Sequence, residues 1–251
     1  MRATRAIVAV WLAGMSALPA QAQSPAGPRQ MLVELSGGFL TTTRTFTDSA
    51  APMINAEAGQ IRASYVVPRS AIFSVGAYTQ VWRQLSAGVL FGQSSRSSSA
   101  SITASLPHPF FFSRSRQVEG TEPDAERSES TLAVLLRREF PVARRRATVA
   151  VFGGPAWLSV RQDVVERINY SETYPYDTAA FTSAVVTSAK KTQLGLLVGA
   201  DVLHFVSRRL GVGAGVRYSA TNADLPASLS SGVLAIKTGG LDVNAGIRFR
   251  F

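Results

Sequence analysis

The sequence predicts an all-β protein: an eight-stranded antiparallel transmembrane β-barrel with short turns at one end and long loops at the other. Three observations predict it. Residues 241–251 alternate between apolar and polar side chains without a break, seven earlier segments repeat the pattern, and the connections alternate in length. A period of two is typical of a strand between two unlike environments.

Residues 1–22 are expected to be a signal peptide. Arg2 and Arg5 precede a short apolar stretch over 6–18, and Ala20-Gln21-Ala22 has the small-x-small form of a cleavage site. The remainder divides into a short N-terminal segment, 23–30, and a barrel domain, 31–251. The whole chain carries a formal charge of +10, so loss of the two leader arginines would leave +8.

The composition limits how an exported chain of this kind can fold. There is no cysteine, which excludes a disulfide framework and a thiolate site. Beyond the leader, the most apolar stretch, 194–206, is interrupted by Asp201 and His204. If the mature chain lies in a membrane, strands must span it, with every backbone polar group paired inside a closed sheet.

The seven earlier segments are 31–41, 72–81, 85–92, 131–140, 149–160, 193–205 and 210–219. Apart from the fifth, their apolar faces contain, in that order, Val33, Leu35 and Phe39; Phe73, Val75 and Val81; Leu85, Val89 and Phe91; Leu132, Val134 and Leu136; Leu194, Leu196 and Val198; and Leu210, Val212 and Val216. The fifth is the least regular, because Gly153, Gly154 and Pro155 interrupt it. They predict a bulge or a local gap in the ladder.

Three connections are short (82–84, 141–147 and 206–209) and four are long (42–71, 93–130, 161–192 and 220–239). Short periplasmic turns and long extracellular loops are typical of bacterial outer-membrane barrels, and an even strand number places both termini in the periplasm. In the second long connection, Ser101 and Thr103 alternate with Ala100 and Ile102. This alternation predicts a strand that continues above the membrane.

Alternation alone leaves open which face is wet, since a secreted soluble barrel would turn the apolar face inward. The polar face is rich in glycine, as at Gly211, Gly213 and Gly215, and a narrow eight-stranded interior needs such small residues. Aromatic residues near strand ends predict interfacial girdles; these are Phe39, Phe140, Phe205, Tyr218 and Phe251. Both features favour a membrane barrel.

The leader, the eight alternating segments and the closing residues 247–251 resemble the small outer-membrane β-barrel proteins of Gram-negative bacteria. The resemblance implies location in the cell outer membrane, in contact with its lipid and lipopolysaccharide. It also implies that Phe251, supported by Ile247 and Phe249, forms the assembly signal read by the barrel assembly machinery.

The polar face predicts a lumen charge network. Its members are Glu34, Arg137, Glu139, Asp201, Arg217, Asp242, Arg248 and Arg250. Because the first and last strands must meet, Glu34 is expected near Arg248 or Arg250. A structural plug of salt bridges is favoured over an ion gate or narrow pore, since barrels of this size rarely leave a continuous channel.

Aromatic residues in the long loops are candidates for binding an extracellular ligand, which the sequence does not identify. They are Phe110, Phe111, Phe112, Tyr170, Tyr174 and Tyr176. Alternatively, these rings pack the loops against one another or rest on lipid.

No convergent catalytic set is found. His108 and His204 are distant in sequence, and the scattered acidic residues lack metal-ligand spacing, so neither a catalytic site, a metal nor a cofactor is expected. The surplus of arginine fits either contacts with phosphates or positions in the lumen and the turns. Export of the chain argues against a nucleic-acid partner. The expected function is a structural or surface-interaction barrel, with a small passive channel as the alternative and a lipid-modifying enzyme less favoured.

Overall fold

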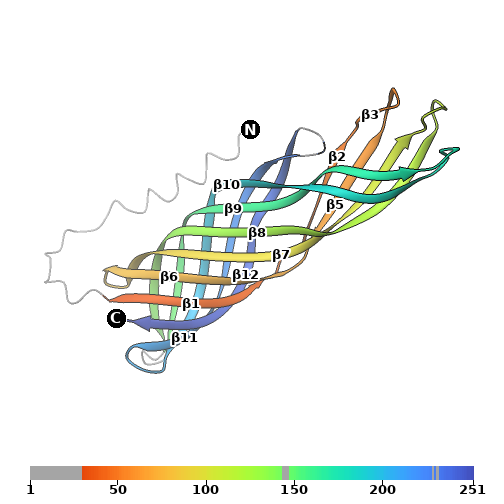
Figure 1. Cartoon of the computed structure of the whole chain (residues 1–251). Helices are drawn as coiled ribbons and strands as arrows, with labels where there is room; N and C mark the ends of the chain where they lie inside the picture. Colours follow the sequence, from red (N-terminus) through yellow and green to blue (C-terminus); the bar gives the residue numbers. More distant parts are fainter. Residues whose placement is uncertain (1–29, 143–146, 228, 230–231) are drawn as a thin grey trace.

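A computed structural model describes residues 30–142, 147–227, 229 and 232–251, so the signal-peptide prediction lies outside the described residues. The described strands are β1 (Met31–Leu40), β2 (Arg44–Ala50), β3 (Met53–Ile54), β4 (Glu57–Ala58), β5 (Gln60–Val67), β6 (Ser70–Trp82), β7 (Leu85–Pro107), β8 (Ser115–Val142), β9 (Ala147–Glu172), β10 (Ala179–Phe205), β11 (Leu210–Pro226) and β12 (Val233–Arg250). Figure 1 shows a barrel that continues on one side into a long extension. In this part of the chain, no helix is long and apolar enough to cross a membrane.

Eight of the described strands close into an antiparallel ring in the order β1, β6, β7, β8, β9, β10, β11 and β12. The first and last strands form the seam, where Leu32 lies opposite Arg250 and Leu40 opposite Asp242. Met31 and Phe251 exchange two backbone hydrogen bonds of 2.9 and 3.1 Å. The predicted fold class is therefore confirmed, with both ends of the described barrel domain on the side of the short turns (Figure 1).

Beyond the barrel, the ring divides into three parts that together form the distal extension. Pairing between β8 and β9 stops at Arg127, pairing between β10 and β11 stops at Leu196, and pairing between β1 and β12 stops at Leu40. Above these levels stand a four-stranded sheet of β2, β5, β7 and β8, a β9–β10 hairpin and a β11–β12 hairpin. The four long connections are thus mostly strand rather than loop, because the alternation continues through them.

In the barrel, apolar side chains face outward and charged side chains face inward. The exposed outward residues include Leu35, Phe73, Val89, Phe91, Leu132, Leu136, Trp157, Leu194, Leu196, Val212, Val243 and Ile247. By contrast, Arg137 and Arg248 are fully buried and Arg217 is 3% exposed. This arrangement excludes the soluble-barrel alternative for these strands, because it would leave the apolar belt in water.

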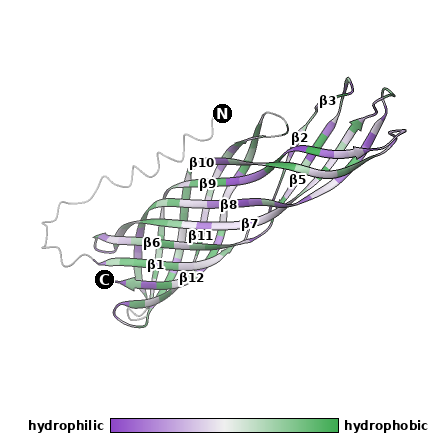
Figure 2. Cartoon of the chain, in the orientation of Figure 1, coloured by the Kyte–Doolittle hydropathy of each residue, from purple (hydrophilic) through white to green (hydrophobic). Residues whose placement is uncertain are grey.

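The apolar face changes sides along a single strand, as β7 shows. In the barrel, Phe91 faces outward and Leu90 inward; farther along, Ser101 faces outward while Ile102 is buried. The pairing of β7 with β8 shifts register between Ser98 and Ala100, but side chains of the same parity on β7 stay inside. The outward face has therefore changed from apolar to polar, as expected for lipid around the barrel and water around the extension. In Figure 2 the barrel strands are mostly green, and purple residues are more frequent farther along the strands.

The interior of the extension is an apolar core to which all three parts contribute. Tyr65 and Ile102 come from the four-stranded sheet, Val165 from the β9–β10 hairpin, and Leu225 and Ile236 from the β11–β12 hairpin. The backbone N–H of Val165 donates a 2.6 Å hydrogen bond to the Tyr65 hydroxyl. Burial raises the pKa of Tyr65 to about 12, so this hydroxyl stays protonated in ordinary buffers.

One local prediction is narrowed and one is wrong. The β8–β9 ladder lacks the pairs at Gly154 and Pro155 but keeps its register, so the irregularity is the predicted local gap rather than a bulge. Phe205 lies on the inner face against the barrel core, with the Arg250 guanidinium 3.8 Å from its ring centre. It therefore does not belong to an outer aromatic girdle, because its parity matches the buried Asp201 and Leu203.

Candidate functional site: charged lumen and distal aromatic tip

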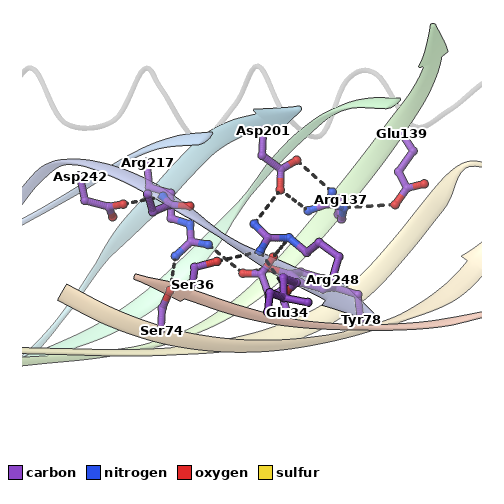
Figure 3. A network of polar contacts seen from close by, with 12 residues as sticks. Glu34, Ser36, Ser74, Tyr78, Arg137, Glu139, Asp201, Arg217, Asp242 and Arg248 are labelled. Carbon is purple, nitrogen blue, oxygen red and sulfur yellow. Dashed lines mark hydrogen bonds and ion pairs between the residues drawn. The ribbon is translucent and has the colours of Figure 1, made fainter. Parts of the chain in front are cut away.

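The barrel interior brings most residues of the predicted lumen charge network into contact, and Figure 3 shows those at its centre. Arg137 and Asp201 form a bidentate pair, with nitrogen–oxygen distances of 2.9 and 3.1 Å. The Arg137 guanidinium also lies 5.2 Å from the ring centre of Tyr78. A buried pair with two parallel hydrogen bonds is fixed in geometry, because the planar guanidinium matches the carboxylate.

Glu34 joins two arginines from neighbouring strands. Its carboxylate lies 2.8 Å from Arg217 and 3.4 Å from Arg248, so the closure contact expected for Glu34 is made with Arg248. Arg248 also lies 3.7 Å from Asp201, which links the two pairs. Gly76 lies against the Glu34 side chain, where a Cβ would come within 2.7 Å of it, so this glycine makes room for the acid.

The remaining members lie at the edges of the network. Asp242 is buried and accepts a 2.7 Å hydrogen bond from Asn244. Glu139 lies 3.3 Å from Arg137 and 3.8 Å from Arg250, and the Glu139 and Arg250 side chains are 23% and 30% exposed. The network is therefore dry at its centre and partly hydrated near the chain termini.

A second buried group, the rim charge cluster of Arg96, Arg127 and Glu129, was missed by the sequence reasoning. Glu129 pairs with Arg96 and, at 2.7 Å, with Arg127, and it accepts a 3.1 Å hydrogen bond from the Gly239 N–H. Arg127 also donates to the Lys237 carbonyl. The cluster thus ties β7, β8 and β12 together near the level where the ring divides.

Parity could have revealed the rim charge cluster. Arg127 and Glu129 lie in phase with the inward Ala133 and Arg137 on β8, and Arg96 in phase with Leu90 on β7. Burial raises the pKa of Glu129, but Arg127 and Arg96 outweigh that effect and hold the pKa below its ordinary value. Glu129 is therefore an anion between two cations at neutral pH.

The architecture is identified by a closed eight-stranded ring that has an exposed apolar belt outside and buried ion pairs inside. The fold is that of the small outer-membrane β-barrel proteins. In such a barrel the inner charges replace the hydrophobic core of a soluble protein.

The chain is similar to several solved outer-membrane structures. Neisserial surface protein A has 10% identity and a TM-score of 0.46, covering 88% of this chain and 97% of its own. Ail, the attachment invasion locus protein of Yersinia pestis, solved with the heparin analogue sucrose octasulfate, has 12% identity and a TM-score of 0.38, covering 88% and 99%. The outer membrane protein AlkL has 10% identity and a TM-score of 0.38, covering 94% and 95%. No protein-family model and no curated protein matches the sequence.

Most of the loop binding candidates meet at the distal tip, where they form the distal aromatic cluster of Phe110, Phe111, Phe112, Tyr174 and Tyr176. The ring centres of Phe110 and Tyr176 are 5.5 Å apart, and those of Tyr174 and Tyr176 are 6.1 Å apart. Phe112 and Tyr174 are 78% and 80% exposed. The tip therefore presents apolar rings to solvent at the end farthest from the barrel (Figure 1).

Polar contacts fix the backbone beneath the distal aromatic cluster. Arg114 lies 3.0 Å from Asp177, and Arg116 of β8 pairs with Glu172 of β9, so the distal ends of the β7–β8 and β9–β10 hairpins are joined twice. The Ser113 N–H donates a 2.8 Å hydrogen bond to Glu57 at the start of β4. Three chain segments thus support one tip.

His108 supports this turn from inside. It is 2% exposed, and its Nδ1 accepts hydrogen bonds from the N–H groups of Phe110 and Phe111 at 3.1 and 3.2 Å. Its Nε2 lies 3.6 Å from Asp177. The turn therefore orients the imidazole through Nδ1, which suits a structural residue better than a base.

Tyr170 does not join the distal aromatic cluster, and its prediction as a loop residue is wrong. It lies within β9 and packs against the apolar core of the extension. The third long connection is strand up to Glu172, which moves Tyr170 below the tip. Among the described residues no group of three or more potential metal ligands is found.

The three residues of the expected assembly signal lie in or next to the barrel seam. Ile247 and Phe251 are exposed, Phe249 is half-buried, and Phe251 exchanges backbone hydrogen bonds with Met31. His204 is exposed on the outer face of β10 near the same end. In the closed barrel this strand is paired on both sides, and its expected role in assembly remains a prediction.

The lumen predicts an electrically silent barrel. The charge network fills the barrel and the apolar core fills the extension, so ions would cross two barriers. We expect planar bilayers containing the folded protein to show no stepwise current, and Arg217→Ala to stay silent because the distal core remains. Stepwise currents in wild type that change in Arg217→Ala would contradict this expectation.

Proposed function

We propose that the chain is a non-catalytic outer-membrane barrel that binds a partner surface through the distal aromatic cluster. The observation that carries this proposal is the group of highly exposed rings held on three cross-linked segments. Exposed aromatic side chains on a rigid support are the usual anchors of protein recognition, and monomeric proteins rarely leave such patches without a use.

The passive channel is less well supported, because the described lumen contains the buried ion pairs. The lipid-modifying enzyme is also less well supported, since His108 is buried and engaged by its own turn, and His204 stands on the outer face. The surface-interaction function requires neither a pore nor a catalytic group.

Lipopolysaccharide is the proposed lipid partner. Arg161 and Lys190 are direct cross-strand partners and are both exposed on the outer face. Each lies four residues farther from the barrel along its strand than Trp157 or Leu194, which belong to the apolar belt. Like charges directly opposite one another are unfavourable unless an anion intervenes, and lipid phosphates at the membrane surface are suitable anions. Biogenesis through the barrel assembly machinery, read from residues 247–251, belongs to the same proposal.

The test replaces Phe110, Phe111 and Tyr174 together with serine. We expect the number of bacteria attached to cell monolayers to fall at least tenfold when they display this variant, because the variant lacks the apolar anchors. Val233→Ser is the matched control, since Val233 is 71% exposed on the β11–β12 hairpin away from the tip. Heat-modifiable gel mobility checks that each variant is folded. Equal attachment of wild type and the triple variant would reject the tip as the binding surface.

A further inference from the structure

A polar hollow of about 670 Å³ lies beside the tip, where β2 ends. Its lining includes Gln60 and Arg62 of β5, Thr103 and Ser105 of β7, and Gln117 of β8. The volume falls within the range of small-molecule sites, roughly 300–1,000 Å³. At its edge the Gly59 N–H donates a 2.8 Å hydrogen bond to the Pro52 carbonyl, which closes the β3–β4 hairpin. Glu57 of that hairpin accepts a hydrogen bond from Ser113 of the tip, so the hollow and the tip are connected.

Strand register arranges the polar groups of the hollow in two rows. Gln60, Ser105 and Gln117 are neighbours across three strands, and Arg62 and Thr103 form the next row. Rows on one face lie about 6.6 Å apart and strands about 4.8 Å apart. Five polar side chains thus face the same space from a sheet that the ladder keeps rigid.

The chemistry of these side chains selects a ligand class. Two amides and two hydroxyls each donate and accept hydrogen bonds, which suits the vicinal hydroxyls of a sugar. Arg62 is exposed and has no ion pair with any residue in the described part of the chain. Its guanidinium is therefore available to a carboxylate, which it can bind through two parallel hydrogen bonds.

We propose that the polar hollow binds a short oligosaccharide that carries a carboxylate. Arg62 holds the carboxylate, and Gln60 and Gln117 orient the sugar hydroxyls. Pro52 supplies an apolar wall for the C–H face of a ring. This inference deepens the proposed surface-interaction function by naming the ligand chemistry, and it rests on that function.

The experiment measures binding of 3′-sialyllactose and of lactose to the full folded protein in nanodiscs by saturation-transfer NMR titration. We expect saturable binding of sialyllactose at least tenfold tighter than that of lactose. Arg62→Ala should weaken the binding of sialyllactose roughly tenfold, to the affinity measured for lactose, because one charge-assisted contact is lost. Gln117→Ala should weaken both sugars.

Thr121→Ala is the matched control, since Thr121 is exposed on the same face of β8 but outside the hollow. It should bind like wild type. Absence of saturable binding, equal affinity for the two sugars, or wild-type affinity in Arg62→Ala would each overturn the inference. The triple tip variant separates the two proposals. If wild type binds the sugar and the triple variant attaches normally, the tip alone is rejected; if wild type binds no sugar and the triple variant attaches poorly, the hollow alone is rejected.

Discussion

Asp201→Ala should lower the free energy of unfolding by about 3–5 kcal/mol, because it leaves the fully buried Arg137 without its bidentate partner. Arg248, 3.7 Å from the same carboxylate, loses a second contact. Unfolding in urea, followed by tryptophan fluorescence of the protein in detergent micelles, measures the change.

Two further variants separate charge from packing at this site. Arg137→Met combined with Asp201→Leu should restore most of the lost stability, since replacing both partners of a buried pair by apolar groups is often neutral. Glu139→Ala should change stability by less than about 1 kcal/mol, because Glu139 is partly hydrated. A single Asp201→Ala variant as stable as wild type would show that the lumen network does not hold the barrel together.

Glu129→Gln should loosen the distal extension, since Arg96 and Arg127 would share a buried site with no anion. The expected loss of local stability is about 3–5 kcal/mol. Amide hydrogen exchange over residues 233–239 measures it, because the Gly239 N–H donates to Glu129. Exchange in that segment should accelerate at least 100-fold. Glu119→Gln, exposed on the outer face of the same strand, should leave exchange unchanged.

Acid should produce the same loosening in wild type. The folded state holds the pKa of Glu129 below its ordinary value of 4.5. Its stabilising contribution is therefore fully present above that value and is lost as the pH falls below it. Exchange in residues 233–239 should accelerate below pH 4.5 in wild type but much less in Glu129→Gln. Matching acid responses in the two proteins would assign the effect to another group.

The sequence was sufficient for the barrel because period-two alternation reports each change of environment. It placed Glu34, Arg217 and Arg248 on one face, and the structure brings them within ion-pair distance. Strand closure fixed the Glu34–Arg248 contact, since the first and last strands of a barrel must be neighbours.

The distal half was harder to predict because the polar and apolar faces of its strands exchange sides. Once water replaces lipid outside, a polar outward face and an apolar inward face resemble an ordinary loop with scattered hydrophobic residues. The alternation around Ser101 and Thr103 predicts a continued strand, but it does not show that Arg96 and Glu129 lie in the interior. Tyr170 was misplaced likewise, because local composition does not report where a long hairpin ends. The polar hollow depends on register among three strands, which no single segment specifies.

The change of sides along β7 also fixes how deep the protein sits in its bilayer. The outward apolar stretch from Leu85 to Phe91 measures only about 20 Å along the strand, and strand tilt shortens its vertical reach. A hydrocarbon layer of about 30 Å would overhang the serines above it. Lipids beside β7 should therefore thin locally, while β10, whose outward apolar residues extend from Leu194 to Val202, meets a thicker layer on the other side of the barrel.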